Sequence, residues 1–223
     1  MKKINIVTGH YGSGKTEFAI NYALKLKDSF GSSVICDMDI VNPYFRTNDA
    51  IDFLSKNSVN VIAPEYANTN LDLPSLPSDI ISVFSENSPP SVLDVGGDDD
   101  GAIALGQFYP YLSKEDYEMF FVINALRPDT ADTESILKLA KDIEYASRCR
   151  ITSIVNNTNL AYLSSVKDIL DSFGLINEVA DKMNVPIKYI SGTPDILIKL
   201  PSEYKDKLFP IKLFMQLPFD ALA

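Results

Sequence analysis

The sequence predicts an α/β fold in which a mostly parallel sheet is flanked by helices. Short apolar runs alternate with helical stretches along the chain, which is typical of strand–helix–strand units. Several of these runs are apolar without interruption, as expected of parallel strands that are buried on both faces. The chain has 223 residues, of which 46% are hydrophobic and 22% are charged. This size and composition allow a sizeable core, and we expect residues 1–223 to form a single domain.

Seven short apolar segments are expected to form the strands. They are residues 4–8, 33–37, 59–63, 91–95, 118–124, 151–156 and 186–191. Stretches with helical periodicity lie between them. This order predicts strands that are joined by crossover helices.

Two amphipathic helices are expected over residues 16–30 and 130–148, because apolar residues recur there at helical spacing. Gly31 is the candidate C-cap of the first helix. Asp129 or Thr130 is the candidate N-cap of the second.

Prolines interrupt two other stretches. Residues 68–78 contain Pro74 and Pro77 and are expected to form a loop. The stretch that starts at residue 201 contains Pro210 and Pro218, so no element is assigned to it.

The composition excludes several classes of function. The chain carries 20 Lys and Arg against 30 Asp and Glu, and this net charge of −10 argues against a nucleic-acid partner. Cys36 and Cys149 form no C-x-x-C motif, and His10 is the only histidine, which excludes a zinc site built from several histidines. The N-terminal residues do not form a signal peptide, and the apolar runs are shorter than the ~18 residues that span a membrane. We therefore expect a cytoplasmic protein.

Residues 9–16, GHYGSGKT, match the phosphate-loop pattern G-x-x-x-x-G-K-[ST], between a predicted strand and a predicted helix. Glycines let such a loop turn its N–H groups toward phosphate oxygens, and the following helix adds free N–H groups and the positive end of its dipole. Lys15 is expected to reach the β- and γ-phosphates, and the Thr16 hydroxyl to bind Mg²⁺. The nucleotide-binding residues expected here are Gly9, Tyr11, Gly12, Ser13, Gly14, Lys15, Thr16 and Glu17.

A second motif, D-x-x-G, closes the predicted strand at residues 91–95. Asp94 is expected to hold Mg²⁺, usually through water, and Gly97 to bring a backbone N–H to the γ-phosphate. Three further carboxylates follow at residues 98–100. Because they would repel a phosphate, most of them are expected to face solvent or to cap the next helix.

Asp37 and Asp39 end the second predicted strand and lie on the same side of it. One or both are expected to contact the Mg²⁺ shell or to orient the attacking water. Lys15, Asp37 and Asp39 are therefore the candidate catalytic residues, and Thr16, Asp39 and Asp94 the candidate metal ligands. Arg46, in the loop that follows, reaches the γ-phosphate or a partner in one interpretation and is a surface arginine in the other.

Together these motifs resemble the CobQ/CobB/MinD/ParA-type P-loop nucleotide-binding proteins, the class that includes MinD, ParA and the nitrogenase iron protein. The resemblance extends from residue 4 to about residue 191. It implies ATP and Mg²⁺ as ligands, and a protein partner or a homodimer. In that class a lysine often follows the first glycine of the loop and crosses to the partner's nucleotide. His10 stands at that position here, which puts dimerisation by the class's route in question.

The resemblance also bears on the base. Guanine-specific relatives carry N-K-x-D after a late strand, whereas residues 156–159 are N-N-T-N, which favours ATP over GTP. Asn156 is the first candidate for contact with adenine, and Asn157 is the second. Pro194, with its neighbours Thr193 and Asp195, is expected near the base.

Three functions remain open from the sequence. The first is a Mg²⁺-dependent ATPase that acts as a nucleotide-dependent switch or accessory protein. The second is a small-molecule kinase or ATP-dependent ligase, whose second pocket would come from residues 42–46 and 65–77. The third is a nucleotide-binding adaptor that does not hydrolyse. Residues 205–217 are too poor in basic residues, and too interrupted by Pro210, to favour a membrane-binding helix.

Overall fold

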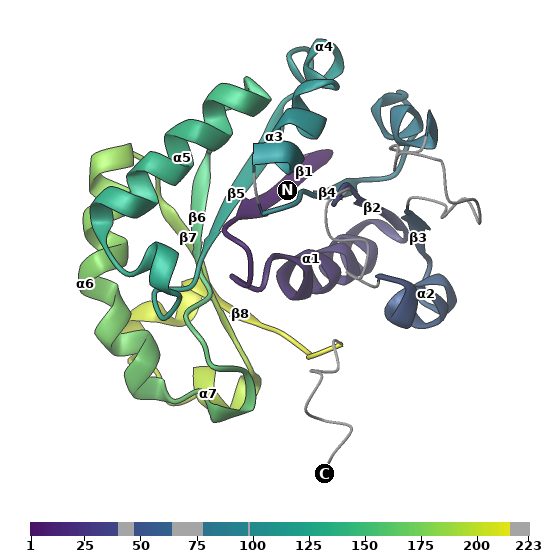
Figure 1. Cartoon of the computed structure of the whole chain (residues 1–223). Helices are drawn as coiled ribbons and strands as arrows, with labels where there is room; N and C mark the ends of the chain where they lie inside the picture. The colour runs from purple at the N-terminus through teal and green to yellow at the C-terminus, as the bar shows by residue number, and fades with distance from the viewer. Residues whose placement is uncertain (40–46, 64–77, 98, 215–223) are drawn as a thin grey trace, which may run out of the picture.

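The structure is a computed structural model, and it describes residues 1–39, 47–63, 78–97 and 99–214. Its strands form one eight-stranded sheet of order β3-β2-β4-β1-β5-β6-β7-β8. Each neighbouring pair of strands in this sheet is parallel. The expected α/β fold with a parallel sheet and flanking helices is confirmed (Figure 1).

The strands are β1 (Ile4–Gly9), β2 (Ser33–Asp37), β3 (Val59–Ile62), β4 (Ser91–Asp94), β5 (Tyr117–Ile123), β6 (Ser153–Asn156), β7 (Ile187–Gly192) and β8 (Leu208–Pro210). The helices are α1 (Lys15–Phe30), α2 (Thr47–Lys56), α3 (Asp99–Gly106), α4 (Tyr109–Leu112), α5 (Thr133–Ser147), α6 (Val166–Met183) and α7 (Pro194–Leu197). All seven predicted strands are present, and their ends differ from the prediction by no more than two residues.

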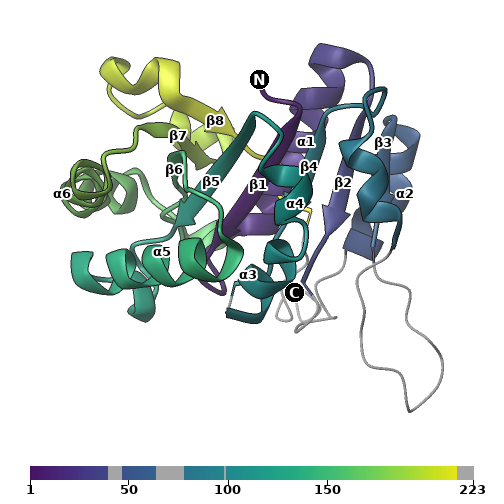
Figure 2. The same cartoon turned by 90° about the horizontal axis from the view of Figure 1, so that it is seen from above.

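The sheet separates two hydrophobic layers. α3, α4, α5 and α6 cover one face, and α1 and α2 cover part of the other (Figures 1 and 2). Strand residues alternate between the layers: Ile4 and Ile6 of β1 pack under α3–α6, whereas Val7 packs against α1. Burial on both faces explains why the strands are so continuously apolar.

The ends of α1 follow from its sequence. The helix begins at Lys15, directly after the phosphate-loop motif, with Gly14 at φ 84° as its N-cap residue. Gly31 adopts φ 88° and donates its N–H to the carbonyl of Lys27, which confirms the predicted C-cap.

The predicted cap of α5 was wrong. The helix begins at Thr133, and the side chain of Asp132 accepts a hydrogen bond from the N–H of Ser135. Residues 128–130 instead form a 3₁₀ turn, in which the Thr130 hydroxyl donates to the carbonyl of Asn124 at 2.6 Å. This hydrogen bond uses the Thr130 side chain that a cap would need.

Only α1 and α5 correspond to helices predicted with residue bounds, and β8 has no counterpart among the predicted strands. α6 begins with a capping box between Ser165 and Asp168, a strong local signal. β8 pairs with β7 at the edge of the sheet, where Pro210 is tolerated as the last strand residue. Residues 68–77 of the predicted loop lie outside the described residues, and Ser78 begins a 3₁₀ turn. None of the described helices is both long and apolar enough to cross a membrane.

Candidate functional site

The candidate site lies at the carboxyl ends of the central strands. β1 stands in the middle of the sheet with β4 on one side and β5 on the other. The phosphate loop follows β1, so residues after β2, β4, β5 and β6 gather around it. Carboxyl ends of parallel strands are the usual place for a ligand in such sheets.

Two loop glycines leave no space for a side chain. A Cβ on Gly9, whose φ is 148°, would lie 2.2 Å from the carbonyl oxygen of Val122. A Cβ on Gly14, whose φ is 84°, would lie 2.3 Å from Nδ2 of Asn157. The loop is therefore packed directly against β5 and against the residues that follow β6.

Side chains hold several backbone carbonyls of the loop. Nδ2 of Asn157 donates to the carbonyl of Ser13 at 2.7 Å, and Nε of Arg127 donates to that of Gly12 at 2.9 Å. Nζ of Lys15 donates to the carbonyl of His10 at 3.1 Å. Fixing these planar peptides fixes the direction of their N–H groups as well, which preorganises the loop for an anion.

One polar atom of the loop is buried without a partner. Oγ of Ser13 makes no hydrogen bond with the described part of the chain. A buried hydroxyl without a partner is costly in a protein interior. A phosphate bound in the loop would supply an acceptor for it.

The backbone of the D-x-x-G motif closes over the loop. A Cβ on Gly97 would lie 2.6 Å from Nζ of Lys15 and 2.6 Å from the backbone nitrogen of Tyr11. The Lys15 side chain is itself 8% exposed. Gly97, Lys15 and the loop thus meet at one point, as the sequence predicts for a γ-phosphate site.

Three carboxylates approach this point from β2 and β4. Asp37 and Asp94 are register partners on the adjacent strands β2 and β4 and are both buried. The Thr16 hydroxyl donates to Oδ2 of Asp94, and the backbone N–H of Asp39 donates to Oδ1 of Asp37 at 3.0 Å. The predicted metal-binding side chains of Thr16 and Asp94 therefore lie side by side.

Burial, and then the charge of Asp37, raise the pKa of Asp94 to about 8, and Thr16 and Lys15 offset part of this rise. Oδ1 of Asp94 is buried without a hydrogen-bond partner in the described residues. This is an environment that a cation would relieve. In the described ranges, no group of three or more His, Cys, Asp or Glu side chains forms a metal site of its own. A site with few carboxylates fits Mg²⁺, which keeps several waters and phosphate oxygens in its coordination shell.

The side chains of two predicted residues, Tyr11 and Glu17, have other surroundings. Tyr11 is 65% exposed. The Glu17 carboxylate accepts the N–H of Phe214, at 2.9 Å to Oε1 and 3.0 Å to Oε2. Because Glu17 lies in the first turn of α1, its backbone N–H points toward the end of the helix that an anion would approach.

The two candidate base-contacting asparagines have different environments. Asn156 is 0% exposed, and its amide donates to Ser172 at 2.9 Å while its Oδ1 accepts from the N–H and hydroxyl of Thr158. The predicted contact of Asn156 with adenine would therefore require these hydrogen bonds to break. Asn157 links the loop to β7, because its Oδ1 accepts from the hydroxyl of Ser191 at 2.7 Å. Pro194 is the first residue of α7, in the segment that follows β7.

Sequence reasoning missed a contribution from the segment between β5 and α5. Besides the contact of Arg127 with Gly12, Nε2 of His10 lies 3.4 Å from Oδ2 of Asp129. Nδ1 of His10 is 2.8 Å from the carbonyl oxygen of Tyr11. No local pattern marks Arg127 or Asp129, because their proximity to the loop depends on β5 lying next to β1.

Several predicted residues lie outside the part of the chain that the structure describes. They include Arg46, residues 42–45 and residues 65–77. The second pocket expected of a kinase or ligase falls on these segments. Asp98 is outside as well, and α3 begins at Asp99.

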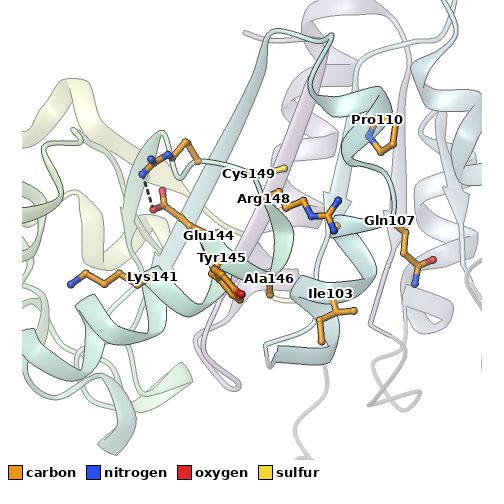
Figure 3. A pocket seen from close by; sticks show the side chains of 11 residues that line it. Ile103, Gln107, Pro110, Lys141, Glu144, Tyr145, Ala146, Arg148 and Cys149 are labelled. Atoms are coloured by element: carbon orange, nitrogen blue, oxygen red, sulfur yellow. Dashed lines mark hydrogen bonds and ion pairs between the residues drawn. The ribbon is translucent and has the colours of Figure 1, made fainter.

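A cavity of about 980 Å³ lies between α3, α4 and the C-terminal half of α5 (Figure 3). Ile103 and Gln107 contribute to one wall, and Tyr145 and Arg148 to the other. None of the predicted site residues lines it. Among the described residues, none of the phosphate loop lines it.

Neither a protein-family model nor a curated protein sequence matches this chain. Solved structures do match it. The cell division protein FtsY from Thermotoga maritima has a TM-score of 0.54 and 20% identity, over 84% of this chain and 60% of that chain. The signal recognition particle receptor FtsY from Elizabethkingia anophelis, in complex with GDP, has a TM-score of 0.52 and 17% identity, over 86% of this chain and 57% of that one.

A third similar structure is a nucleotide-binding protein from Archaeoglobus fulgidus in complex with ADP. Its TM-score is 0.51 and its identity 16%, over 88% of this chain and 85% of that chain. This chain spans about 60% of the length of the FtsY chain from Thermotoga. At these identities the similarity concerns the fold alone: this chain has the α/β fold that these FtsY structures and the Archaeoglobus nucleotide-binding protein share.

Proposed function

We propose that this chain binds Mg²⁺ and ATP at residues 9–17 and hydrolyses ATP as a nucleotide-dependent switch of the MinD/ParA type. One observation carries the proposal. The phosphate loop is preformed, and its Thr16 is hydrogen-bonded to the buried Asp94, whose other oxygen has no partner in the described residues. This is the arrangement that a nucleotide-bound Mg²⁺ would complete.

Each side chain has a distinct task in this proposal. Lys15 and the loop N–H groups bind the β- and γ-phosphates, and Gly97 brings its backbone to the γ-phosphate. Thr16 and Asp94 hold Mg²⁺, directly or through water. Asp37 and Asp39 complete its hydration shell or orient the attacking water. When bound, Mg²⁺ neutralises the charge that develops on the phosphate oxygens.

ATP is the proposed nucleotide. The stretch at residues 156–159 lacks the Lys and Asp of the guanine-reading motif. The Archaeoglobus protein of similar fold and length is described in complex with ADP. The FtsY from Elizabethkingia is described in complex with GDP, so the fold alone does not decide the base. Asn157 and the segment at Pro194 remain proposed neighbours of the base.

The switch role rests on α3. This helix begins at Asp99, two residues after Gly97, and it packs against α5. A change at the γ-phosphate would therefore reach α3 directly. A protein partner or a second copy of the chain would sense that change.

Titration with ATP and GTP in the presence of Mg²⁺, followed by steady-state turnover, tests this function. Lys15→Ala removes the charge that faces the phosphates and is expected to lower turnover by about 10²-fold or more. Lys167→Ala is the matched control, because Lys167 is exposed and pairs only with Asp171 in the described structure. Turnover that survives Lys15→Ala, or tighter binding of GTP than of ATP, would reject the corresponding part of the proposal.

A further inference from the structure

The segment that joins β5 to α5, residues 124–132, contacts the phosphate loop at two residues. Nε of Arg127 donates to the carbonyl of Gly12, and a Cβ on Gly12 would lie 3.3 Å from that nitrogen and 3.4 Å from Cζ. Two residues further on, Asp129 contacts His10. The guanidinium of Arg127 therefore lies directly against the backbone of the loop.

The backbone that carries Arg127 is fixed by hydrogen bonds. Oδ1 of Asn124 accepts the N–H of Leu126 at 3.1 Å and that of Asn159 at 3.3 Å, and its Nδ2 donates to the carbonyl of Asn159 at 2.9 Å. The N–H of Arg127 and the hydroxyl of Thr130 both donate to the carbonyl of Asn124. Arg127 thus projects from a turn that is held in place by the residues following β6.

Sheet order decides which part of a nucleotide Arg127 would face. Asp94 and Gly97 approach the loop from β4, on one side of β1. Arg127 approaches from β5, on the opposite side of β1, the side on which β6 and β7 also lie. If the γ-phosphate and Mg²⁺ occupy the β4 side, the rest of the nucleotide extends past Arg127.

The guanidinium of Arg127 has further N–H donors besides Nε. Arg127 is exposed, and its hydrogen bond to Gly12 uses only Nε. Its two terminal nitrogens make no hydrogen bond or ion pair with the part of the chain that the structure describes. A planar, always charged guanidinium that is held at one edge can lay its face against an aromatic ring.

We propose that Arg127 binds the nucleoside end of the nucleotide, with its guanidinium plane against the purine base while Nε holds Gly12 of the loop. The proposal rests on the proposed nucleotide binding and adds the residue that covers the base. Arg127 acts on affinity rather than on the chemical step. ATP and ADP share this nucleoside, so both should depend on Arg127 equally.

The experiment compares Arg127→Ala and Arg127→Lys with wild type, by calorimetric titration with Mg·ATP and Mg·ADP and by steady-state turnover. Arg127→Ala is expected to raise Kd for both nucleotides about tenfold, between the effects of an exposed and of a desolvated cation–π contact, and to leave kcat within about threefold. Arg127→Lys keeps the charge and a donor for Gly12 but loses the planar face, so its Kd should stay close to that of Arg127→Ala. Arg150→Ala is the matched control, because the Arg150 side chain is 86% exposed and pairs with Glu144.

Three results would overturn the assignment. An unchanged Kd would show that Arg127 does not touch the nucleotide. A loss confined to ATP, or a fall in kcat alone, would place the guanidinium at the γ-phosphate. Full rescue by lysine would reduce Arg127 to a positioning residue of the loop. If wild type binds neither nucleotide, the proposed function itself fails, whereas normal wild-type binding with an unaffected Arg127→Ala rejects Arg127 alone.

Discussion

At the scale of single residues, Asp94 is a carboxyl group whose surroundings disfavour its charged form. Its carboxyl is buried next to Asp37, and these surroundings raise its pKa to about 8. The folded state then binds a proton more tightly than the unfolded state, where an aspartate titrates near ~4. By linkage, the free energy of unfolding of the metal-free protein should fall as pH rises from about 4 toward 8.

Asp94→Asn removes this penalty. We expect the variant to raise the melting temperature of the metal-free protein at pH 8 by a few degrees, since about 1 kcal/mol corresponds to roughly 2–4 °C for a chain of this size. At pH 5 the difference between the two proteins should be much smaller, because most of the loss of wild-type stability falls between pH 5 and 8. Thermal unfolding in EDTA at both pH values measures this effect, and Mg²⁺-dependent turnover should be lost. A lower melting temperature of the variant at pH 8 would contradict it.

At the scale of elements, the loops after four strands hold the phosphate loop from different sides. Asn157, after β6, bonds to Ser13 of the loop and to Ser191 of β7. Because Asn157 is 1% exposed, neither bond can be replaced by bulk water. The rigidity of the site therefore depends on the packing of neighbouring loops as much as on its own glycines.

Asn157→Ala should lower the free energy of unfolding by about 1–3 kcal/mol, because it leaves two buried polar groups without their partner. It should also weaken nucleotide binding, since the Ser13 peptide is no longer fixed. Urea unfolding and ATP titration measure the two effects. Asn60→Ala, at an exposed position of β3, is the control and should change neither. Wild-type affinity in Asn157→Ala would show that the loop holds its shape unaided.

At the scale of the whole molecule, the question is whether one chain supplies all the charge that hydrolysis needs. His10 occupies the position where the resembled class often has a lysine. It lies 3.4 Å from the carboxylate of Asp129. Histidine as a residue type lacks the permanent positive charge of lysine, and a missing cation of this kind is worth roughly 10³–10⁵ in rate.

We therefore expect slow turnover by the isolated chain, well under ~1 per second, unless Arg46 or a partner provides the cation. His10→Lys should raise turnover or promote nucleotide-dependent dimerisation. Steady-state ATPase assays and light scattering on both proteins measure these effects. Rapid turnover by a monomeric wild type that is unaffected by Arg46→Ala would show that no cation is missing.

The strands, α1 with its Gly31 cap, and the position of the phosphate-loop motif between β1 and α1 could all be predicted from the sequence. Each of these features depends on residues that are close together in the sequence. An apolar run marks a strand, eight consecutive residues form the loop motif, and one glycine marks the end of the helix. It also placed Asp37 and Asp94 at strand ends, and the parallel register then brought them together.

Which distant residues contact the loop depends on the order of the strands in the sheet. Arg127 and Asp129 reach it because β5 is the neighbour of β1, and Asn157 reaches it because β6 follows β5 in the sheet. Asn156 and Asn157 are adjacent in sequence, yet one points toward α6 and the other toward the loop. Local patterns carry no information on strand order, since neighbouring positions in the sheet are set by the packing of crossover helices over long separations in the chain.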